Sequence, residues 1–333
     1  MGEGSGHPDS MRTAFLGSYG FGNLGDELCL IEAMQSFPST EAQAFSTGAE
    51  WTMRCAPGLS GCFRTGDAMM EFTPERVVLG GGHVGTVEAF AAFLPWMNRA
   101  AEAGAELHIH NIGVSSAVLD DRIGEDSHAA LRRLTSFTVR DPASAVSVAA
   151  WGLPVRPGLS RFPERALVPD RSIATAMLPT GRPLLGISII PYPLMDRCLR
   201  VDAARVRALL LPFTGHVVVP IVSTIHRDTG DEDDATGFRR FADRFLDGWD
   251  MALTEMLDPV WWQANMTPAR LRGVIGRLDT LISQRKHNVI HGIGAGIRTI
   301  GLHPAEDNSV PRTMVAVADN LPRGSTCIGL RHQ

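Results

Sequence analysis

The sequence predicts an α/β protein built from two doubly wound, Rossmann-like domains that face each other across a cleft. Short apolar runs with the composition of buried strands alternate with amphipathic runs of helical period, which is typical of parallel sheets covered by helices on both faces. The alternation occurs twice, and residues 152–182, rich in proline and without clear period, separate the two series. The 333 residues are also enough for two ordinary domains.

The first series predicts strands at 12–18, 76–82, 106–114 and 134–141. Leu28, Ile31 and Met34 are spaced three apart and predict a helix over 27–37. We expect a second helix over 86–104, disturbed at Pro95. A third helix runs to Ala150, because Asp141 is a good N-cap and Pro142 suits the first helical position.

The second series predicts strands at 183–190, 216–222, 278–284 and 297–302. Helices are expected over 236–246, from Thr267-Pro268 to about Leu278, and from Lys286 onward. The predicted domain organisation is a disordered leader or tag over 1–10, an N-terminal domain over 11–160, a linker over 161–182 and a C-terminal domain over 183–333.

Composition excludes several classes of protein. The net charge of −5 argues against a nucleic-acid binder, which needs a basic excess. No apolar stretch reaches the roughly 18–20 residues of a membrane span, and the first ten residues lack the pattern of a signal peptide. The five cysteines form no CxxC pair, which favours reduced thiols. We expect a cytoplasmic protein.

A glycine-rich segment, GSYGFGNLGDE over 17–27, follows the first predicted strand. It contains the dinucleotide pattern G-x-G-x-x-G at Gly20, Gly22 and Gly25, but a nicotinamide site also needs an acid at the end of the second strand. Glu41 has about that spacing, and no convincing strand precedes it. Asp26 either complements the dipole of the following helix or faces the cleft as a base.

Other polar residues follow predicted strands, and in doubly wound sheets ligands bind beyond the carboxyl ends of the strands. They are Gly81, Gly82 and His83 in GGGHVG, Arg140 in TVRD, and Arg285, Lys286 and His287 in SQRKHNVIHGIGAG. Arginine offers a planar fork for carboxylate or phosphate, and histidine delivers a proton near neutral pH. We therefore predict an anion site at residues 285–287.

Several further patterns have simpler explanations. His287 and His291 resemble the zinc motif H-E-x-x-H, but Asn288 stands where the general base would be, so no metal is expected. The acidic run 228–234 is most simply a solvated loop, and the alternative is that it caps the cleft. His108 and His110 alternate on a strand and share one face, which is usually structural. The paired Trp261 and Trp262 favour the core or an interface over a sugar platform.

Taken in order, four segments resemble the polysaccharide pyruvyl transferase family. They are GSYGFGNLGDE, the GGG turn at 80–82, VRD at 139–141, and ISQRKHNVIHGIGAGIRTIGL near the C-terminus. The resemblance implies a GT-B-like fold, phosphoenolpyruvate as donor substrate without a further cofactor, and a pair of sugar hydroxyls as acceptor. The product would be a pyruvate ketal on a surface glycan, an exopolysaccharide, or its lipid-linked precursor.

On the matching motifs, Arg285 and His287 would take the family's donor-site arginine and histidine, and Arg140 the arginine of its VRD motif. The chemistry of this donor then suggests further roles: Arg140, in the N-terminal domain, and Arg285 and Lys286, in the C-terminal donor-side domain, would hold the anionic donor, and His287 would protonate it. Asp26 would act as base for the acceptor hydroxyl in the N-terminal, acceptor-side domain. Acceptor or cleft contacts would come from Gly22, Asn23, Gly25, Gly81, Gly82 and His83. The family often has an arginine, as in SVRP, where this chain has Ile190, so this cation is absent unless Arg197 or Arg200 substitutes for it.

Two alternatives remain open at this point. One is a GT-B glycosyltransferase that uses a sugar nucleotide, with Glu306 or Asp307 holding the ribose. The other is a non-catalytic relative that binds a glycan or anion. Peripheral association with the inner face of the membrane and homo-oligomerisation are both compatible with the sequence, and binding of nucleic acid is not expected.

Overall fold

The computed structural model describes residues 11–80, 87–114, 124–160, 167–226, 233–307, 309–317 and 320–333. The chain forms two compact units. Unit 1 comprises Met1–Phe21 and Asp26–Ala166, and unit 2 comprises Gly22–Gly25 and Leu167–Gln333. Thus the first unit gives way to the second inside the stretch predicted as a linker, and a piece of the glycine-rich segment belongs with unit 2. Gly81, Gly82 and His83 lie outside the described residues.

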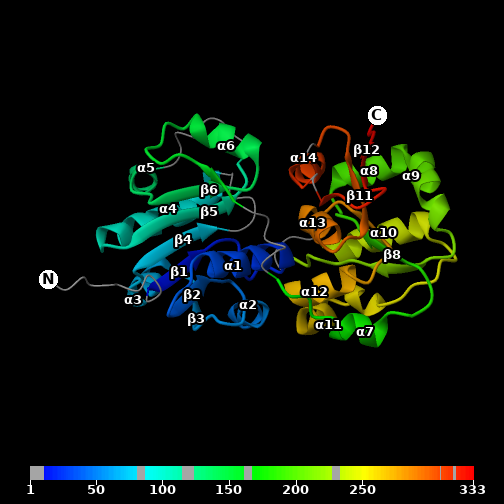
Figure 1. Ribbon diagram of the computed structural model, residues 1–333, viewed down its shortest axis with the longest axis horizontal. Coiled ribbons are helices and arrows are strands. Elements are labelled where there is room, and N and C mark those ends of the chain that lie inside the picture. Colours follow the sequence, from blue (N-terminus) through cyan, green and yellow to red (C-terminus); the bar gives the residue numbers. More distant parts are fainter. Residues whose placement is uncertain are drawn as a thin grey trace. The chain divides into compact units, whose positions relative to one another are not determined.

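In the described part of unit 1 a seven-stranded parallel sheet has the order β3-β2-β1-β4-β5-β6-β7 (Figure 1). Its strands are β1 (Arg12–Leu16), β2 (Glu41–Phe45), β3 (Gly61–Phe63), β4 (Arg76–Gly80), β5 (Glu106–Ile112), β6 (Ser136–Val139) and β7 (Gly158–Leu159). Its helices are α1 (Leu24–Ser36), α2 (Ala49–Cys55), α3 (Gly66–Glu71), α4 (Val87–Glu102), α5 (Glu125–Arg132) and α6 (Pro142–Ala149).

Apolar side chains cover both faces of this sheet. One cluster joins α4, α5 and α6 to the strands through residues such as Leu94, Leu131 and Val148. The other joins α1 to the opposite face through Leu30 and Ala33. Helices on both faces explain why the central strands β1 and β4 are buried along almost their whole length rather than at alternate residues.

Unit 2 contains, within its described residues, a five-stranded parallel sheet of order β12-β11-β10-β8-β9. Its strands are β8 (Leu184–Ser188), β9 (Val217–Pro220), β10 (Thr280–Ser283), β11 (Arg298–Pro304) and β12 (Thr326–Leu330). Its helices are α7 (Ser172–Met177), α8 (Pro193–Val201), α9 (Ala203–Leu210), η2 (Leu211–Phe213), α10 (Asp234–Phe245), η4 (Thr254–Leu257), α11 (Pro259–Asn265), α12 (Pro268–Ile275), α13 (Lys286–Gly294) and α14 (Ser309–Ala316).

Capping side chains fix where several helices begin. Asp141 accepts a hydrogen bond from Ser144 N at 2.9 Å at the start of α6, and Thr267 accepts one from Arg270 N at 3.3 Å at the start of α12. Both caps are followed by proline, which lacks the N–H that a first helical turn leaves unpaired. The helix starts predicted at these two positions are confirmed.

The predicted strands all occur, but three predictions need correction. Helix α4 continues through Pro95 as one helix. A strand does contain Glu41, yet the residue begins β2 instead of ending it, so the acid of a dinucleotide site is missing from the strand's end. The stretch 152–182 holds β7 and α7 as well as loops.

Candidate functional site

Polar side chains gather at the carboxyl edge of the unit 2 sheet. Three neighbouring strands, β10, β8 and the edge strand β9, run parallel and end at Ser283, Ser188 and Pro220. Because parallel strands end at the same edge, the residues after them lie close together. This edge is the place where the sequence predicted an anion site.

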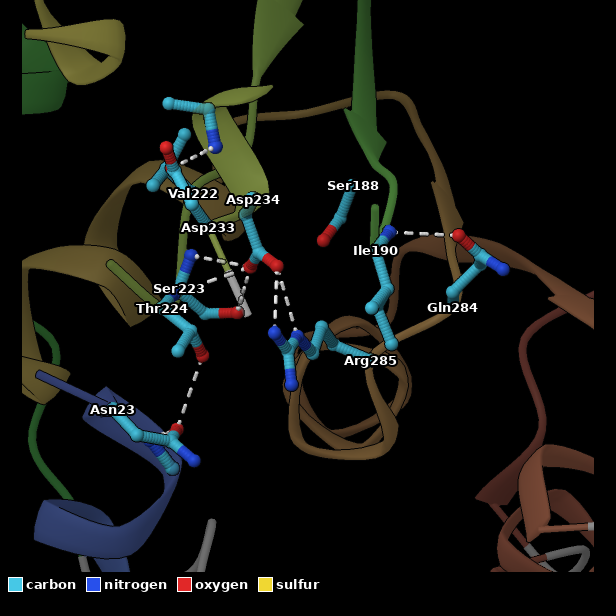
Figure 2. A network of polar contacts seen from close by, with 12 residues as sticks. Asn23, Ser188, Ile190, Val222, Ser223, Thr224, Asp233, Asp234, Gln284 and Arg285 are labelled. Carbon is cyan, nitrogen blue, oxygen red and sulfur yellow. Dashed lines mark hydrogen bonds and ion pairs between the residues drawn. The ribbon is translucent and has the colours of Figure 1, made fainter. Parts of the chain in front are cut away.

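Asp234, the first residue of α10, is the centre of this group (Figure 2). Its side chain is completely buried. Oδ1 accepts hydrogen bonds from Arg285 Nε at 3.0 Å and Nη2 at 2.8 Å. Oδ2 accepts from Ser223 N at 3.1 Å, Ser223 Oγ at 3.0 Å and Thr224 N at 3.1 Å. Burial raises the pKa of Asp234, and the charge of Arg285 works against that rise.

The pair with Asp234 fixes the orientation of Arg285, whose side chain is 14% exposed. The ion pair uses Nε and Nη2, and a guanidinium has five N–H donors in a rigid fork. Arg285 is therefore paired with an acid of its own unit, and the two hydrogen bonds to Asp234 fix its guanidinium at the carboxyl edge of the sheet.

Two further hydrogen-bond links connect the strand ends. Asn288 Nδ2 donates to Ser188 Oγ at 2.9 Å and to Ser223 Oγ at 3.1 Å. Gln284 Oε1 accepts from Ile190 N at 2.7 Å. The loops after β8, β9 and β10 are thus joined by side chains, so this edge is preorganised.

Helix α13 begins at this edge. Arg285 is its N-cap and makes no side-chain capping bond to the helix; Lys286 and His287 are its first two residues. The first N–H groups of a helix have no partner within it and carry partial positive charge, which suits an anion. The structure therefore brings together three of the predicted residues at one helix start.

Gly22–Gly25, the part of the glycine-rich segment that belongs to unit 2, contacts the same region. Leu24 N donates to Ser223 O at 2.9 Å. A Cβ on Gly25 would overlap Nδ1 of the His287 ring, so glycine is what lets the imidazole lie there. The predicted residues Gly22, Asn23 and Gly25 thus lie in unit 2, beside the helix that carries His287.

The remaining predicted residues belong to unit 1. Asp26 is buried in the first turn of α1. Arg140 follows β6; its N donates to Ile112 O at 3.1 Å, its Nε lies 3.8 Å from Asp141 Oδ2, and a Cβ on Gly113 would overlap its guanidinium. Their predicted roles as base and donor ligand stay predictions.

Next to Asp26, Glu27 organises the first part of the glycine-rich segment. Its buried Oε1 accepts from Gly20 N at 2.7 Å and from Thr52 Oγ1 at 3.3 Å. Gly20 has a φ of +83°, a conformation that glycine adopts without steric cost. Glu27 therefore stabilises the turn between β1 and α1.

Three of the other histidines lie in the buried parts of their units. His108 and His110 share one face of β5, as predicted, and both rings contact Phe37. His110 Nε2 bonds the buried Glu32 carboxylate at 2.9 Å. His291 is buried in α13, and burial lowers its pKa to about 3. No group of three potential metal-ligating side chains occurs among the described residues.

Other sequence predictions can also be placed. Trp262 is buried, and its Nε1 donates to Val222 O at 2.8 Å, so it belongs to the core as expected. Arg200 pairs with Asp196 on its own helix and is exposed. Glu306 lies 3.0 Å from His332 Nδ1. All five cysteines are free thiols, and no helix in the described ranges has the length and apolar character to cross a membrane.

Asp234 is the main site residue that the sequence analysis missed. It belongs to the acidic run that was expected to be a solvated loop, and that expectation is wrong for Asp234, because its side chain is buried. A signal was present, since the acidic run directly precedes a predicted helix. Asp233 caps that helix by accepting from Ala235 N at 2.9 Å. Because Asp233 is the N-cap, Asp234 is the first residue of α10. From there its side chain reaches Ser223 and Thr224, which follow β9.

No family model and no curated protein matches the chain. Solved structures match over almost its whole length. A Listeria monocytogenes protein assigned as a UDP-N-acetylglucosamine 2-epimerase is 12% identical with a TM-score of 0.58, over 97% of this chain and 85% of that chain. MnaA of S. aureus, in a co-structure with UDP, is 10% identical with a TM-score of 0.57, over 98% and 85%.

A third match is the UDP-GlcNAc 2-epimerase of Neisseria meningitidis bound to UDP-GlcNAc, which is 9% identical with a TM-score of 0.56, over 92% of this chain and 85% of that chain. At these identities the likeness shows the fold. The chain has a GT-B-like fold of two doubly wound α/β domains, which confirms the fold class predicted from its sequence.

Proposed function

We propose that the chain is an enzyme of saccharide metabolism that binds the phosphate of an activated donor at the start of α13. One observation carries the proposal: Arg285, held by buried Asp234, lies with Lys286 and His287 at a helix start on the carboxyl edge of a parallel sheet. Side-chain cations and helix N–H groups at one point are what a phosphate requires.

The donor that the fold supports best is a sugar nucleotide. Two of the structurally similar proteins contain UDP or UDP-GlcNAc, and ligands of such sheets bind at the carboxyl edge of the strands. A nucleotide also needs a partner for its ribose. Glu306 and Asp307 follow β11, the strand next to β10, at the same edge.

Phosphoenolpyruvate is the second candidate, and the composition of the helix start favours it. No glycine occurs between Ser283 and His291, whereas diphosphates are usually cradled by bare backbone at glycines. Side chains of Gln284, Arg285 and Lys286 occupy this stretch instead, which suits a small donor gripped by side chains. The resemblance to pyruvyl transferases rests on the same residues.

Calorimetric titration with UDP-GlcNAc, UDP and phosphoenolpyruvate tests the proposal and separates the donors. We expect one class to bind, and Arg285→Lys to weaken it about tenfold or more, because lysine keeps the charge near Asp234 but lacks the fork. Arg182→Ala is the matched control, since Arg182 pairs with Asp250 just before β8, at the amino end of that strand. Equal affinity in wild type and Arg285→Lys would refute the site.

Turnover then distinguishes an enzyme from a binding protein. Release of UDP from UDP-GlcNAc, or of phosphate from phosphoenolpyruvate in the presence of a saccharide, is the expected activity. His287→Ala should abolish turnover with an unchanged fold, because His287 lies in the first turn of α13 and a histidine delivers a proton near neutral pH. Full activity in that variant would exclude His287 from the reaction.

A further inference from the structure

The turn Ser223–Ile225 in unit 2 lies between two segments from distant parts of the sequence. Two backbone hydrogen bonds of 2.9 Å each join it to Gly22–Leu24. A third, also 2.9 Å, runs from Asp234 N to Thr224 O on its other side. Both pairings are antiparallel bridges. Gly22–Leu24 therefore support the same turn that binds Asp234, the partner of Arg285.

Asn23 adds side-chain bonds to this arrangement (Figure 2). Its Oδ1 accepts from Thr224 Oγ1 at 3.3 Å and from Gly25 N at 2.9 Å. The first bond holds the turn, and the second holds the segment's own backbone in a local turn typical of asparagine. One amide oxygen thus ties together residues 201 apart in sequence.

From the turn, a continuous set of bonds leads to the guanidinium. Thr224 N and Ser223 N and Oγ donate to one oxygen of Asp234, and Arg285 donates to the other. Because Asp234 is buried and accepts bonds at both oxygens, a shift of the turn must move or weaken its bonds to Arg285. The orientation of Arg285 therefore depends on what holds the turn in place.

Two glycines make the close approach of the segment feasible. Gly22 has a φ of +91°, and a Cβ there would overlap the carbonyl oxygen of Ile225. A Cβ on Gly25 would overlap the His287 ring. The requirement for glycine at both positions therefore comes from contacts with other residues of unit 2.

We propose that Gly22–Gly25 is a positioning element of the anion site in unit 2, which orients Arg285 through Thr224 and Asp234 and leaves room for His287. The second and third glycines of the literal dinucleotide pattern, Gly22 and Gly25, then have another physical basis: they fit a backbone that lies against a turn and an imidazole. The inference rests on the proposed function, because it takes Arg285 and His287 as the residues that contact the donor.

Exchange of the Arg285 Nε–H proton, followed by ¹⁵N NMR, tests the positioning without any ligand. Asn23→Ala and Thr224→Val each remove a bond that holds the turn, and we expect exchange about fivefold faster, the effect of one hydrogen bond. Asn23→Asp keeps the acceptor oxygen and should retain slow exchange. Thr214→Val is the matched control, because its hydroxyl bonds Leu211 O just before β9, at the other end of that strand.

Calorimetric titration with UDP-GlcNAc and with phosphoenolpyruvate is the second test, and it measures whether the positioning affects ligand affinity. Whichever ligand the wild type binds should bind about fivefold or more weakly to Asn23→Ala and Thr224→Val, and normally to Thr214→Val. Unchanged Nε–H exchange in both site variants overturns the positioning role. If Nε–H exchange is faster in both variants but the wild type binds neither ligand, the positioning role stands and the proposed function is refuted.

Discussion

Removing Arg285 should destabilise unit 2 because it leaves a buried carboxylate without its cation. Asp234 has no exposed side-chain surface and receives two charge-assisted hydrogen bonds from Arg285. Breaking a buried ion pair at one partner costs about 3–5 kcal/mol. Three bonds from Ser223 and Thr224 remain, so we expect Arg285→Met to cost about 3 kcal/mol at neutral pH, at the lower end of that range.

The double variant Asp234→Asn, Arg285→Met is the matched comparison. A neutral amide keeps an acceptor for Ser223 and Thr224 and buries no charge, so the double variant should be more stable than Arg285→Met alone. Native-state hydrogen exchange measures both through amides of β8 and β10, while amides of β4 report separately on unit 1.

The pH dependence has a definite sign. Burial already raises the pKa of Asp234 and Arg285 opposes that rise, so loss of Arg285 raises the pKa further. A group with a raised folded-state pKa destabilises the native state as pH rises through that range. The cost of Arg285→Met should therefore be smaller at pH 5 than at pH 7.5. A cost below about 0.5 kcal/mol at pH 7.5, the size of an ordinary surface substitution, would refute the reasoning.

Three other predictions follow from single positions. Gly25→Ala should displace the His287 ring, since the added Cβ would overlap Nδ1; two-dimensional NMR should show a shifted His287 resonance, and an unmoved one would contradict the contact. His291 has its pKa lowered to about 3 by burial, so the unfolded state takes up its proton first and stability falls as pH drops below about 6.5. By pH 5 the free energy of unfolding should be about 2 kcal/mol lower than at neutral pH because of this residue. Urea unfolding at the two pH values measures the difference, which should be absent in His291→Leu. Burial raises the pKa of Cys62 to about 11, so iodoacetamide should alkylate it at pH 8 at least ~10-fold more slowly than glutathione, and an equal rate would contradict its burial.

Sequence patterns predicted the fold well where strands are buried on both faces. The strands β1, β4, β8 and β10 are rich in apolar residues and buried at nearly every position, and such runs bounded by turn residues identify strands of parallel sheets. Strand β2 escaped prediction because its sequence, EAQAF, has one exposed and two partly exposed side chains. Its pairing with β1, more than local propensity, makes it a strand.

The candidate site was predictable in part. Residues 285–287 were found because cations after a buried strand and before a helix are a local signal. Asp234 lies 51 positions from Arg285, and no spacing rule connects an acidic loop to a strand end so far away. The contact of Asn23 with Thr224 spans 201 positions, so the segment's place in unit 2 could be found only from the folded structure.

The most direct test of the account is a crystal structure of the protein with UDP-GlcNAc and another with phosphoenolpyruvate. In at least one of them, a phosphate oxygen should lie within hydrogen-bond distance of Arg285 and of the first N–H groups of α13. A bound ligand whose phosphate contacts neither would contradict the account.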